Sequence, residues 1–192
     1  MAFDAMSDTS DADLLSLYAD GDQAAARALM LRHAPQILSL AKRMLKDPVE
    51  AEDVTQEAML KLWKMAPNWR EGEAKVSTWL YRVASNLCTD RLRKKRSVAL
   101  DEVPEMEDET PNVEAQMITA DRGHALRGAM DRLPQRQKLA LTLRHFEDLS
   151  NPEIADVLET SVEAIESLLS RARRNLADDL SSNLLALGLA TE

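Results

Sequence analysis

The sequence is poor in cysteine, glycine and proline, with one, five and seven of them among 192 residues. A lone cysteine excludes an internal disulfide framework and fits a reducing cytoplasm. No apolar run approaches the roughly 18 residues of a membrane span, and the acidic N-terminus is unlike a signal peptide. We therefore expect a cytoplasmic protein.

What is abundant favours helices. Ala, Leu, Glu, Arg and Met dominate and β-branched runs are absent, which predicts an all-α fold. Residues 97–121 contain eight acidic residues and no Lys or Arg, although the whole chain carries a net charge of only −9. With two prolines as well, this segment is typical of a flexible, self-repelling linker. We predict two small helical domains, 1–96 and 119–192, joined by an acidic linker, 97–118.

The first domain ends in a basic helix. Apolar residues recur at Val76, Leu80, Val83 and Leu87, the spacing of one buried helix face, and we expect Cys88 to lie in the core beside them. The opposite face carries Arg82 and Asn86 and ends in a cluster of five cations: Arg91, Arg93, Lys94, Lys95 and Arg96. This arrangement suits a nucleic-acid backbone with unpaired bases beside it; the alternative is a solvated charge run.

The preceding helix has two distinct faces. Asp47 and Pro48 predict its start, and it extends to about Met65. The residues expected in the core are Val54, Ala58, Met59, Leu62 and Trp63. A separate, mostly acidic stripe consists of Asp53, Gln56, Glu57, Leu60 and Lys64.

The second domain carries a helix-turn-helix pattern. We predict helices over residues 117–132 and up to Phe146, the latter with Pro134 inside its first turn. Ser150 and Glu153 form a capping box for a short helix to Leu158. After a tight turn, Thr160 and Glu163 predict a second box for a long helix over 162–180. An αα-hairpin in a plain bundle is the alternative, and the Leu-rich tail, 181–192, either packs or contacts a partner.

Three stretches in this order resemble one family. DPVEAEDVTQEAMLKLW, STWLYRVASNLCTDRLRKKR and LPQRQKLALTLRHFEDLSNPEIADVLETSVEAIESLLSRARRNL are similar to regions 2 and 4 of a bacterial RNA polymerase sigma factor. The short linker, without other regions, resembles the ECF (extracytoplasmic function, group IV) class, close to the sigma-E type. The resemblance implies a protein that binds core RNA polymerase and directs promoter-specific initiation, as in stress responses.

The resemblance also implies residue roles. It assigns the stripe of Asp53, Gln56, Glu57 and Leu60 to the clamp helices of the polymerase β′ subunit. It assigns −10 DNA to Arg82, Asn86, Arg91, Arg93, Lys94, Lys95 and Arg96, with Asn86 holding a flipped base. Trp79 and Tyr81 are candidates for stacking on bases, with a core role favoured for Trp79. It assigns −35 DNA to Arg144, Ser167, Ser170, Arg171 and Arg174. Glu166 and Leu168 stand where many relatives have basic residues.

The family further implies partners and competing interpretations. Its members are commonly inhibited by an anti-sigma factor, often membrane-bound or zinc-binding, so we expect such a partner beside core polymerase, its β subunit included, and promoter DNA. A helix-turn-helix regulator that binds duplex DNA without polymerase is an alternative. An enzyme is disfavoured because the three histidines are scattered and no Gly-rich phosphate loop is present. We expect no catalytic residue, cofactor or metal site.

Overall fold

The computed structural model describes residues 8–70, 75–101 and 117–186, and these residues contain helices and no strand. Its elements are α1 (Asp11–Ala19), α2 (Gln23–Leu45), α3 (Pro48–Met65), the 3₁₀ helix η1 (Ala66–Asn68), α4 (Val76–Asp101), α5 (Met117–Arg132), α6 (Gln135–His145), α7 (Asn151–Val157) and α8 (Val162–Ala186). The predicted all-α fold is confirmed. Within the described part of the chain, no helix is long and apolar enough to cross a membrane.

Helices α1–α4 form the N-terminal bundle, in which α2 packs against the other three. Each of the first three helices begins at a side chain that accepts backbone N–H groups: Ser10 for α1, Asp22 for α2 and Asp47 for α3. Helix α2 continues through Pro35. Apolar side chains from all four helices meet in a fully buried core, including Leu14, Leu29, Leu40, Leu62 and Leu80.

Helix α4 buries Val76 and Leu80 of the predicted face, leaves Val83 and Leu87 half-buried, and extends further than expected. Leu80, Ala84 and Cys88 are buried, and burial raises the pKa of the Cys88 thiol to about 12, so this thiol is an inert core residue. The helix continues to Asp101, five residues into the segment predicted as linker. The first proline after Arg96 is Pro104, so no proline interrupts the helix within these five residues.

Helices α5–α8 form the C-terminal bundle. The capping box at the start of α7 is confirmed: Glu153 N–H donates to Ser150 Oγ, and Ser150 N–H donates to Glu153 Oε2 at 2.9 Å. Helices α7 and α8 follow one another across a short turn and pack together. The core contains Leu143 of α6, Ile154 of α7 and Ile165 of α8, each fully buried. The helix-turn-helix connectivity is as predicted.

Two predictions about helix starts in this bundle were wrong: the place of Pro134 inside the first turn of its helix, and the cap at Thr160. Pro134 is the N-cap residue of α6 and lies before its first turn. The α8 cap is Ser161, whose Oγ accepts the N–H of Ala164 at 3.2 Å, and not Thr160. The two neighbouring hydroxyl residues offer the same chemistry to a sequence pattern. The backbone path out of the turn, with Glu159 at a φ of 49°, decides between them.

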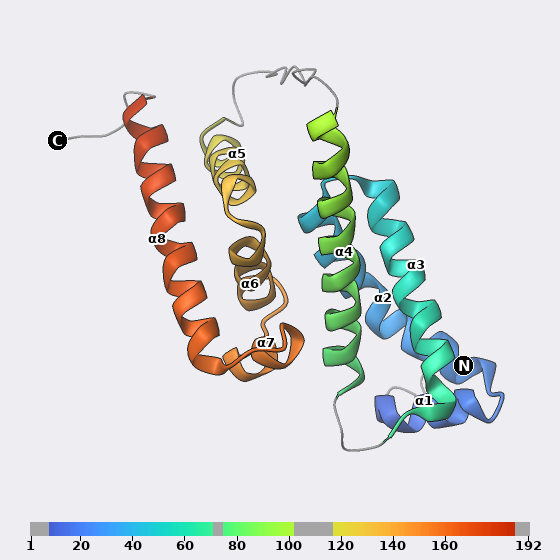
Figure 1. Ribbon diagram of the computed structural model, residues 1–192. Coiled ribbons are helices and arrows are strands. Elements are labelled where there is room, and N and C mark those ends of the chain that lie inside the picture. Colours follow the sequence, from blue (N-terminus) through green and yellow to red (C-terminus); the bar gives the residue numbers. More distant parts are fainter. Residues whose placement is uncertain (1–7, 71–74, 102–116, 187–192) are drawn as a thin grey trace.

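The two bundles lie side by side and contact each other (Figure 1). Helix α4 packs on α7, and α2 packs on α6. The middle of the predicted linker, 102–116, and the end of the Leu-rich tail, 187–192, lie outside the described residues. The domain boundaries at 96 and 119 remain predictions, as do the flexibility of the linker and the role of the tail.

Candidate polymerase and nucleic-acid interfaces

The predicted polymerase stripe lies on the outer face of α3. Asp53, Gln56 and Leu60 are exposed, while Val54, Ala58 and Leu62 turn into the core. Leu60 is 57% exposed, an apolar side chain within a polar surface. Such a combination is typical of surfaces that bind another protein.

The polymerase stripe meets the predicted −10 set at Arg91. The Arg91 guanidinium of α4 lies 3.9 Å from an Asp53 carboxylate oxygen and 3.6 Å from one of Glu57. It also donates a hydrogen bond of 3.0 Å to the backbone carbonyl of Glu50. Sequence reasoning treated the two sets as separate because nothing in the sequence shows that α3 and α4 lie alongside each other.

The remaining cations of α4 divide into paired and open groups. Lys95 Nζ lies 3.1 Å from Glu50 and 3.7 Å from Asp47. Arg93 pairs with Asp90 of its own helix at 2.9 Å. Lys94 and Arg96 are exposed, and the described part of the chain shows no ion pair for either. The five cations are therefore not one uniform basic surface.

The other two predicted −10 residues differ in access. Asn86 is exposed. Arg82 reaches across to the C-terminal bundle, where it donates a 2.8 Å hydrogen bond to the carbonyl oxygen of Asp156 and lies 3.3 Å from the Glu159 carboxylate. Its Nε is buried and makes no hydrogen bond.

The aromatic residues of α4 pack within the protein. Tyr81 is buried and its hydroxyl donates to Glu147 Oε2 at 3.0 Å, with burial raising the Tyr81 pKa above its usual value. Trp79 packs edge-on against Trp69, with ring centroids 6.2 Å apart. The core role favoured for Trp79 fits this packing. In this conformation Tyr81 is not available to stack on a base, contrary to its candidate role.

Four of the five predicted −35 residues share one face of α8. Ser167, Ser170, Arg171 and Arg174 are all exposed, and spacings of three, four and seven residues place them on neighbouring turns. Arg171 Nε donates a hydrogen bond to the carbonyl oxygen of Ser167 in its own helix, at 3.3 Å. The opposite face of α8 buries Ile165, Leu169 and Ala172. Glu166, also exposed, adds a negative charge to this surface.

Arg144, the fifth −35 residue, comes from a different element. It lies at the end of α6, half-buried, and donates a 2.9 Å hydrogen bond to the carbonyl oxygen of Leu149. This contact closes the turn between α6 and α7. Arg144 therefore has a structural partner in addition to its predicted DNA contact.

A helix-turn-helix with a polar outer face is typical of DNA-binding proteins, and here it follows a second helical bundle. Two family matches make the class specific: sigma-70 region 2 matches residues 29–98, and sigma-70 region 4 matches residues 123–176. The chain is 32% identical over 180 residues to the ECF RNA polymerase sigma factor SigM of Mycobacterium tuberculosis, covering 92% of this chain and 88% of that one. The protein therefore belongs to the ECF family of RNA polymerase sigma factors.

Two other comparisons describe its neighbours. It is 31% identical over 172 residues to the ECF sigma factor SigE of Mycolicibacterium smegmatis, covering 86% of this chain and 66% of that relative's length. Among solved structures, CnrH in complex with the cytosolic domain of CnrY is similar, with a TM-score of 0.68 over 90% of this chain and 97% of that one. At 23% identity, that likeness establishes the fold.

Proposed function

We propose that the protein docks on core RNA polymerase through the α3 stripe and reads promoter DNA with α4 and α8. The observation that carries this proposal is that one chain presents two different surfaces: the exposed polar stripe of α3, which includes the apolar Leu60, and the exposed Ser/Arg face of α8. A regulator that binds duplex DNA without polymerase needs only the α8 face. In this assignment the β′ clamp helices contact Asp53, Gln56, Glu57 and Leu60.

The two DNA-facing helices have different tasks. The proposed −10 contacts are Arg82, Asn86, Arg91, Arg93, Lys94, Lys95 and Arg96, with the Asn86 amide offering a donor and an acceptor to an unpaired base. The proposed −35 contacts are Arg144, Ser167, Ser170, Arg171 and Arg174, in the major groove. Glu166 repels phosphate and can accept from a cytosine amino group, so it shapes the −35 preference.

Energetics explain why the chain works with polymerase. Opening DNA costs roughly 1.4 kcal/mol per base step, and holding an unstacked base returns about 1–3 kcal/mol. A chain with a net charge of −9 gains little from phosphate attraction, and part of its α4 charge is already paired with α3. Polymerase supplies the remaining binding energy. We propose that the chain itself catalyses no reaction and acts in the cytoplasm, where this partner resides.

We also propose that an anti-sigma factor controls the protein in a stress response. Two structural neighbours were solved with protein partners: CnrH with the cytosolic domain of CnrY, and the sigma factor RpoE of Bartonella quintana with the anti-sigma factor NepR. An inhibitor that covers the α3 stripe competes directly with polymerase. Whether that inhibitor binds zinc is a property of the partner.

The α3 assignment is tested by an Asp53→Ala/Gln56→Ala double variant. We expect its affinity for core polymerase to fall about tenfold, the effect of losing roughly 1.4 kcal/mol of interface contacts, with run-off transcription reduced accordingly. Asp20→Ala/Gln23→Ala removes the same two residue types from exposed positions at the junction of α1 and α2 and should change neither. Equal affinity for both double variants would contradict docking through α3.

A further inference from the structure

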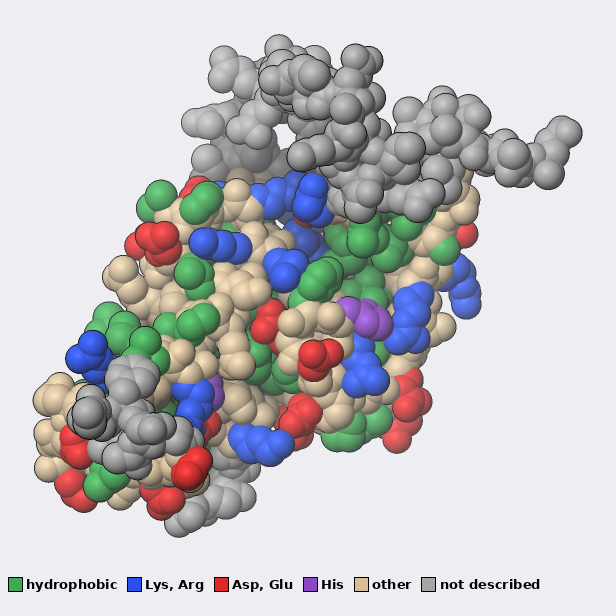
Figure 2. Space-filling view, turned by 180° about the vertical axis from the view of Figure 1, so that it is seen from behind, with side chains coloured by type: hydrophobic (Ala, Val, Ile, Leu, Met, Phe, Trp, Pro, Cys, Tyr) green, Lys and Arg blue, Asp and Glu red, His purple; other side chains and the backbone are tan. Residues whose placement is uncertain are grey.

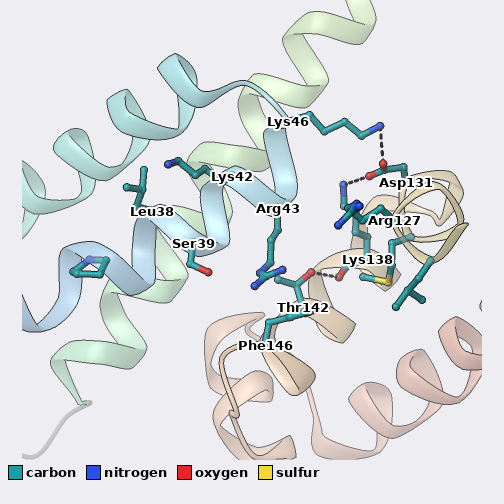
Figure 3. Close-up of a pocket in the computed structure, with 13 residues that line it drawn as sticks. Leu38, Ser39, Lys42, Arg43, Lys46, Arg127, Asp131, Lys138, Thr142 and Phe146 are labelled. Atoms are coloured by element: carbon teal, nitrogen blue, oxygen red, sulfur yellow. Dashed lines mark hydrogen bonds and ion pairs between the residues drawn. The ribbon is translucent and has the colours of Figure 1, made fainter. Parts of the chain in front are cut away.

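A groove between α2 and the C-terminal bundle has a charge opposite to that of the whole chain. Its volume is about 720 Å³, with α2 as one wall and α5, α6 and the α6 C-cap residue Phe146 as the other (Figure 3). The chain carries a net charge of −9, yet five of the residues that line this groove are basic and one is acidic. The basic residues are Lys42, Arg43, Lys46, Arg127 and Lys138, and the acidic one is Asp131. The composition of the chain therefore does not account for this excess of cations.

Two of the lining cations share a single carboxylate. Lys46 Nζ of α2 lies 2.7 Å from one oxygen of Asp131, and Lys138 Nζ of α6 lies 2.8 Å from the other. The Lys138 side chain is only 10% exposed, so water screens its charge less than that of a surface lysine. One carboxylate between two ammonium groups leaves a net positive charge beside the groove. An anion in the groove is therefore attracted to this group.

The two arginines of the groove offer hydrogen-bond donors from opposite walls. The Arg43 guanidinium of α2 lies 3.9 Å from the centre of the Phe146 ring. A guanidinium that stacks on a ring by its face keeps its in-plane N–H groups for another partner. Arg127 of α5 is exposed and forms no ion pair within the described part of the chain. Both side chains reach into the space between the bundles (Figure 3), an arrangement that suits the oxygens of a carboxylate.

Apolar side chains line the rest of the groove, and they also come from both walls. They are Pro35 and Leu38 of α2, and Leu126, Met130 and Phe146 opposite. Leu126 stays 40% exposed and Phe146 44% exposed, so large apolar groups here remain in contact with water. Figure 2 shows apolar side chains and Lys and Arg side chains next to each other in the middle of one face. A concave, largely apolar surface of this volume with a few convergent charged groups is typical of small-molecule sites.

We propose that this groove binds the anion of a long-chain fatty acid, with its carboxylate held by Arg43 and Arg127 and its acyl chain against the apolar side chains. The cations select a negative head group, and the apolar walls select a hydrocarbon chain. A small inorganic anion leaves the apolar walls exposed to water, and a neutral lipid leaves the arginines without an anionic partner. The site goes beyond the proposed function and does not depend on it, because the proposed polymerase and DNA contacts include none of the residues that line the groove.

Ligand binding is tested on the full-length chain with the fluorescent fatty acid cis-parinarate, displaced by oleate below the concentration at which oleate forms micelles. We expect oleate to displace the probe. Oleyl alcohol keeps the chain without the charge, and acetate keeps the carboxylate without the chain. Each lacks one of the two contributions, so each should compete at least about tenfold more weakly than oleate. Equal competition by either compound, or no binding of cis-parinarate, overturns the proposal.

Variants locate the site within the groove. Arg43→Ala and Arg127→Ala should each weaken oleate binding about five- to tenfold, because each removes a charged hydrogen bond. Arg136→Ala removes an exposed arginine of α6 that does not line the groove and should bind as the wild type does. Leu126→Asp places a carboxylate in the apolar wall and should weaken binding about tenfold. Leu17→Asp makes the same change on α1 at a residue with 39% exposure, against 40% for Leu126, and should have no effect.

The paired controls make the outcome decisive. Thermal midpoints confirm that each variant is folded. If both arginine variants bind oleate as Arg136→Ala does, or if Leu126→Asp binds it as Leu17→Asp does, the fatty acid is not held in the groove and the proposal is overturned.

A last comparison separates a free fatty acid from a membrane lipid. Phosphatidylglycerol vesicles present an anionic head group and acyl chains within a bilayer. We expect the protein to bind free oleate and not to sediment with these vesicles; sedimentation without oleate binding overturns the proposal. Run-off transcription with core polymerase tests the proposed function independently. Inactivity there contradicts that function and leaves oleate binding unaffected, whereas failure to bind oleate overturns the groove proposal alone.

Discussion

Helices α4 and α8 both carry cations proposed to bind DNA, and the two helices use them differently. Arg91 and Lys95 of α4 contact acidic side chains of α3, and Arg82 of α4 contacts Glu159 in the turn after α7. Arg171 and Arg174 of α8 are exposed, and in the described part of the chain neither makes an ion pair. A helix that is rich in Lys and Arg in the sequence therefore does not always present a basic surface in the folded protein. On α4 the cations also hold the fold and the domain contact, whereas on α8 they are available for binding alone.

The difference predicts how each cation responds to removal. A side chain that only binds DNA can be deleted without loss of stability. A side chain that also joins two helices cannot. The following experiments, from the largest expected effect to the smallest, either separate α4 from α8 or show that they behave alike.

Arg171→Ala should give the largest effect, and on binding only. Losing one base or phosphate contact costs about 1–3 kcal/mol, so affinity for cognate promoter duplex should fall roughly 5- to 150-fold. The urea midpoint should not move, because the hydrogen bond that Arg171 makes within the described part of the chain goes to a carbonyl of its own helix. Arg173→Ala, also exposed on α8, is the matched control and should retain affinity. A lowered urea midpoint for Arg171→Ala would remove the contrast with α4.

Arg91→Ala should affect stability as well as DNA binding. The substitution removes a hydrogen bond from the Arg91 guanidinium to the backbone carbonyl of Glu50 and two ion pairs with α3. Because these groups are partly exposed, we expect the free energy of unfolding to fall by about 1 kcal/mol. Urea denaturation measures this change. Arg93→Ala is the control. The ion pair that Arg93 makes within the described residues is with Asp90 on its own exposed helix face, so its change should stay within about 0.5 kcal/mol. Similar values for the two variants would show that Arg91 is not a structural residue.

The smallest effect concerns pH at the domain contact. Hydrogen bonds from Lys75 and Ser150 lower the pKa of Glu153 to about 2. Because the pKa of Glu153 is lowered in the folded protein, its ionised carboxyl stabilises the folded form at pH values above the usual pKa near 4.5. This contribution is lost as the pH falls toward 2. We therefore expect the thermal midpoint of the wild type to exceed that of Glu153→Gln at pH 6, and the difference to shrink as pH falls from 5 to 3.

Glu147 provides the opposite control. Burial raises the pKa of the Glu147 carboxyl, so the charged form is disfavoured in the folded protein. The folded form is therefore destabilised as the pH rises through that raised pKa and the carboxyl ionises. Glu147→Gln should therefore gain thermal stability relative to the wild type as pH rises. If both variants respond to pH in the same direction, the two carboxyl groups do not differ as the structure indicates.

Most local features were predictable from sequence. The Asp47 cap before Pro48, the capping box of Ser150 and Glu153 and the burial of Cys88 each follow from residues a few positions apart. Propensity and spacing act over one or two helical turns, where the sequence neighbours are also the spatial neighbours. The exposed face of α8 was predicted for the same reason.

The errors occurred where two local choices had nearly equal energy. Thr160 and Ser161 are both capable caps, and the backbone path selects Ser161. The acidic composition near residue 101 indicated a linker, yet α4 continues to Asp101. Helix α4 is held in the bundle by a core of side chains that are distant in sequence, such as Leu29 and Leu80. The linker prediction rested on the charges near residue 101, which carry no information about that core.

The amino-acid order alone determined the helices, most of their caps and the resemblance that led to the family, and it predicted the division into two domains. Only the tertiary structure decided which charged groups meet. Tyr81 and Glu147 are 66 positions apart, and Lys75 and Glu153 are 78 apart. Such contacts depend on how whole bundles pack, because the energy that brings them together comes from buried apolar surface elsewhere and not from the pair itself.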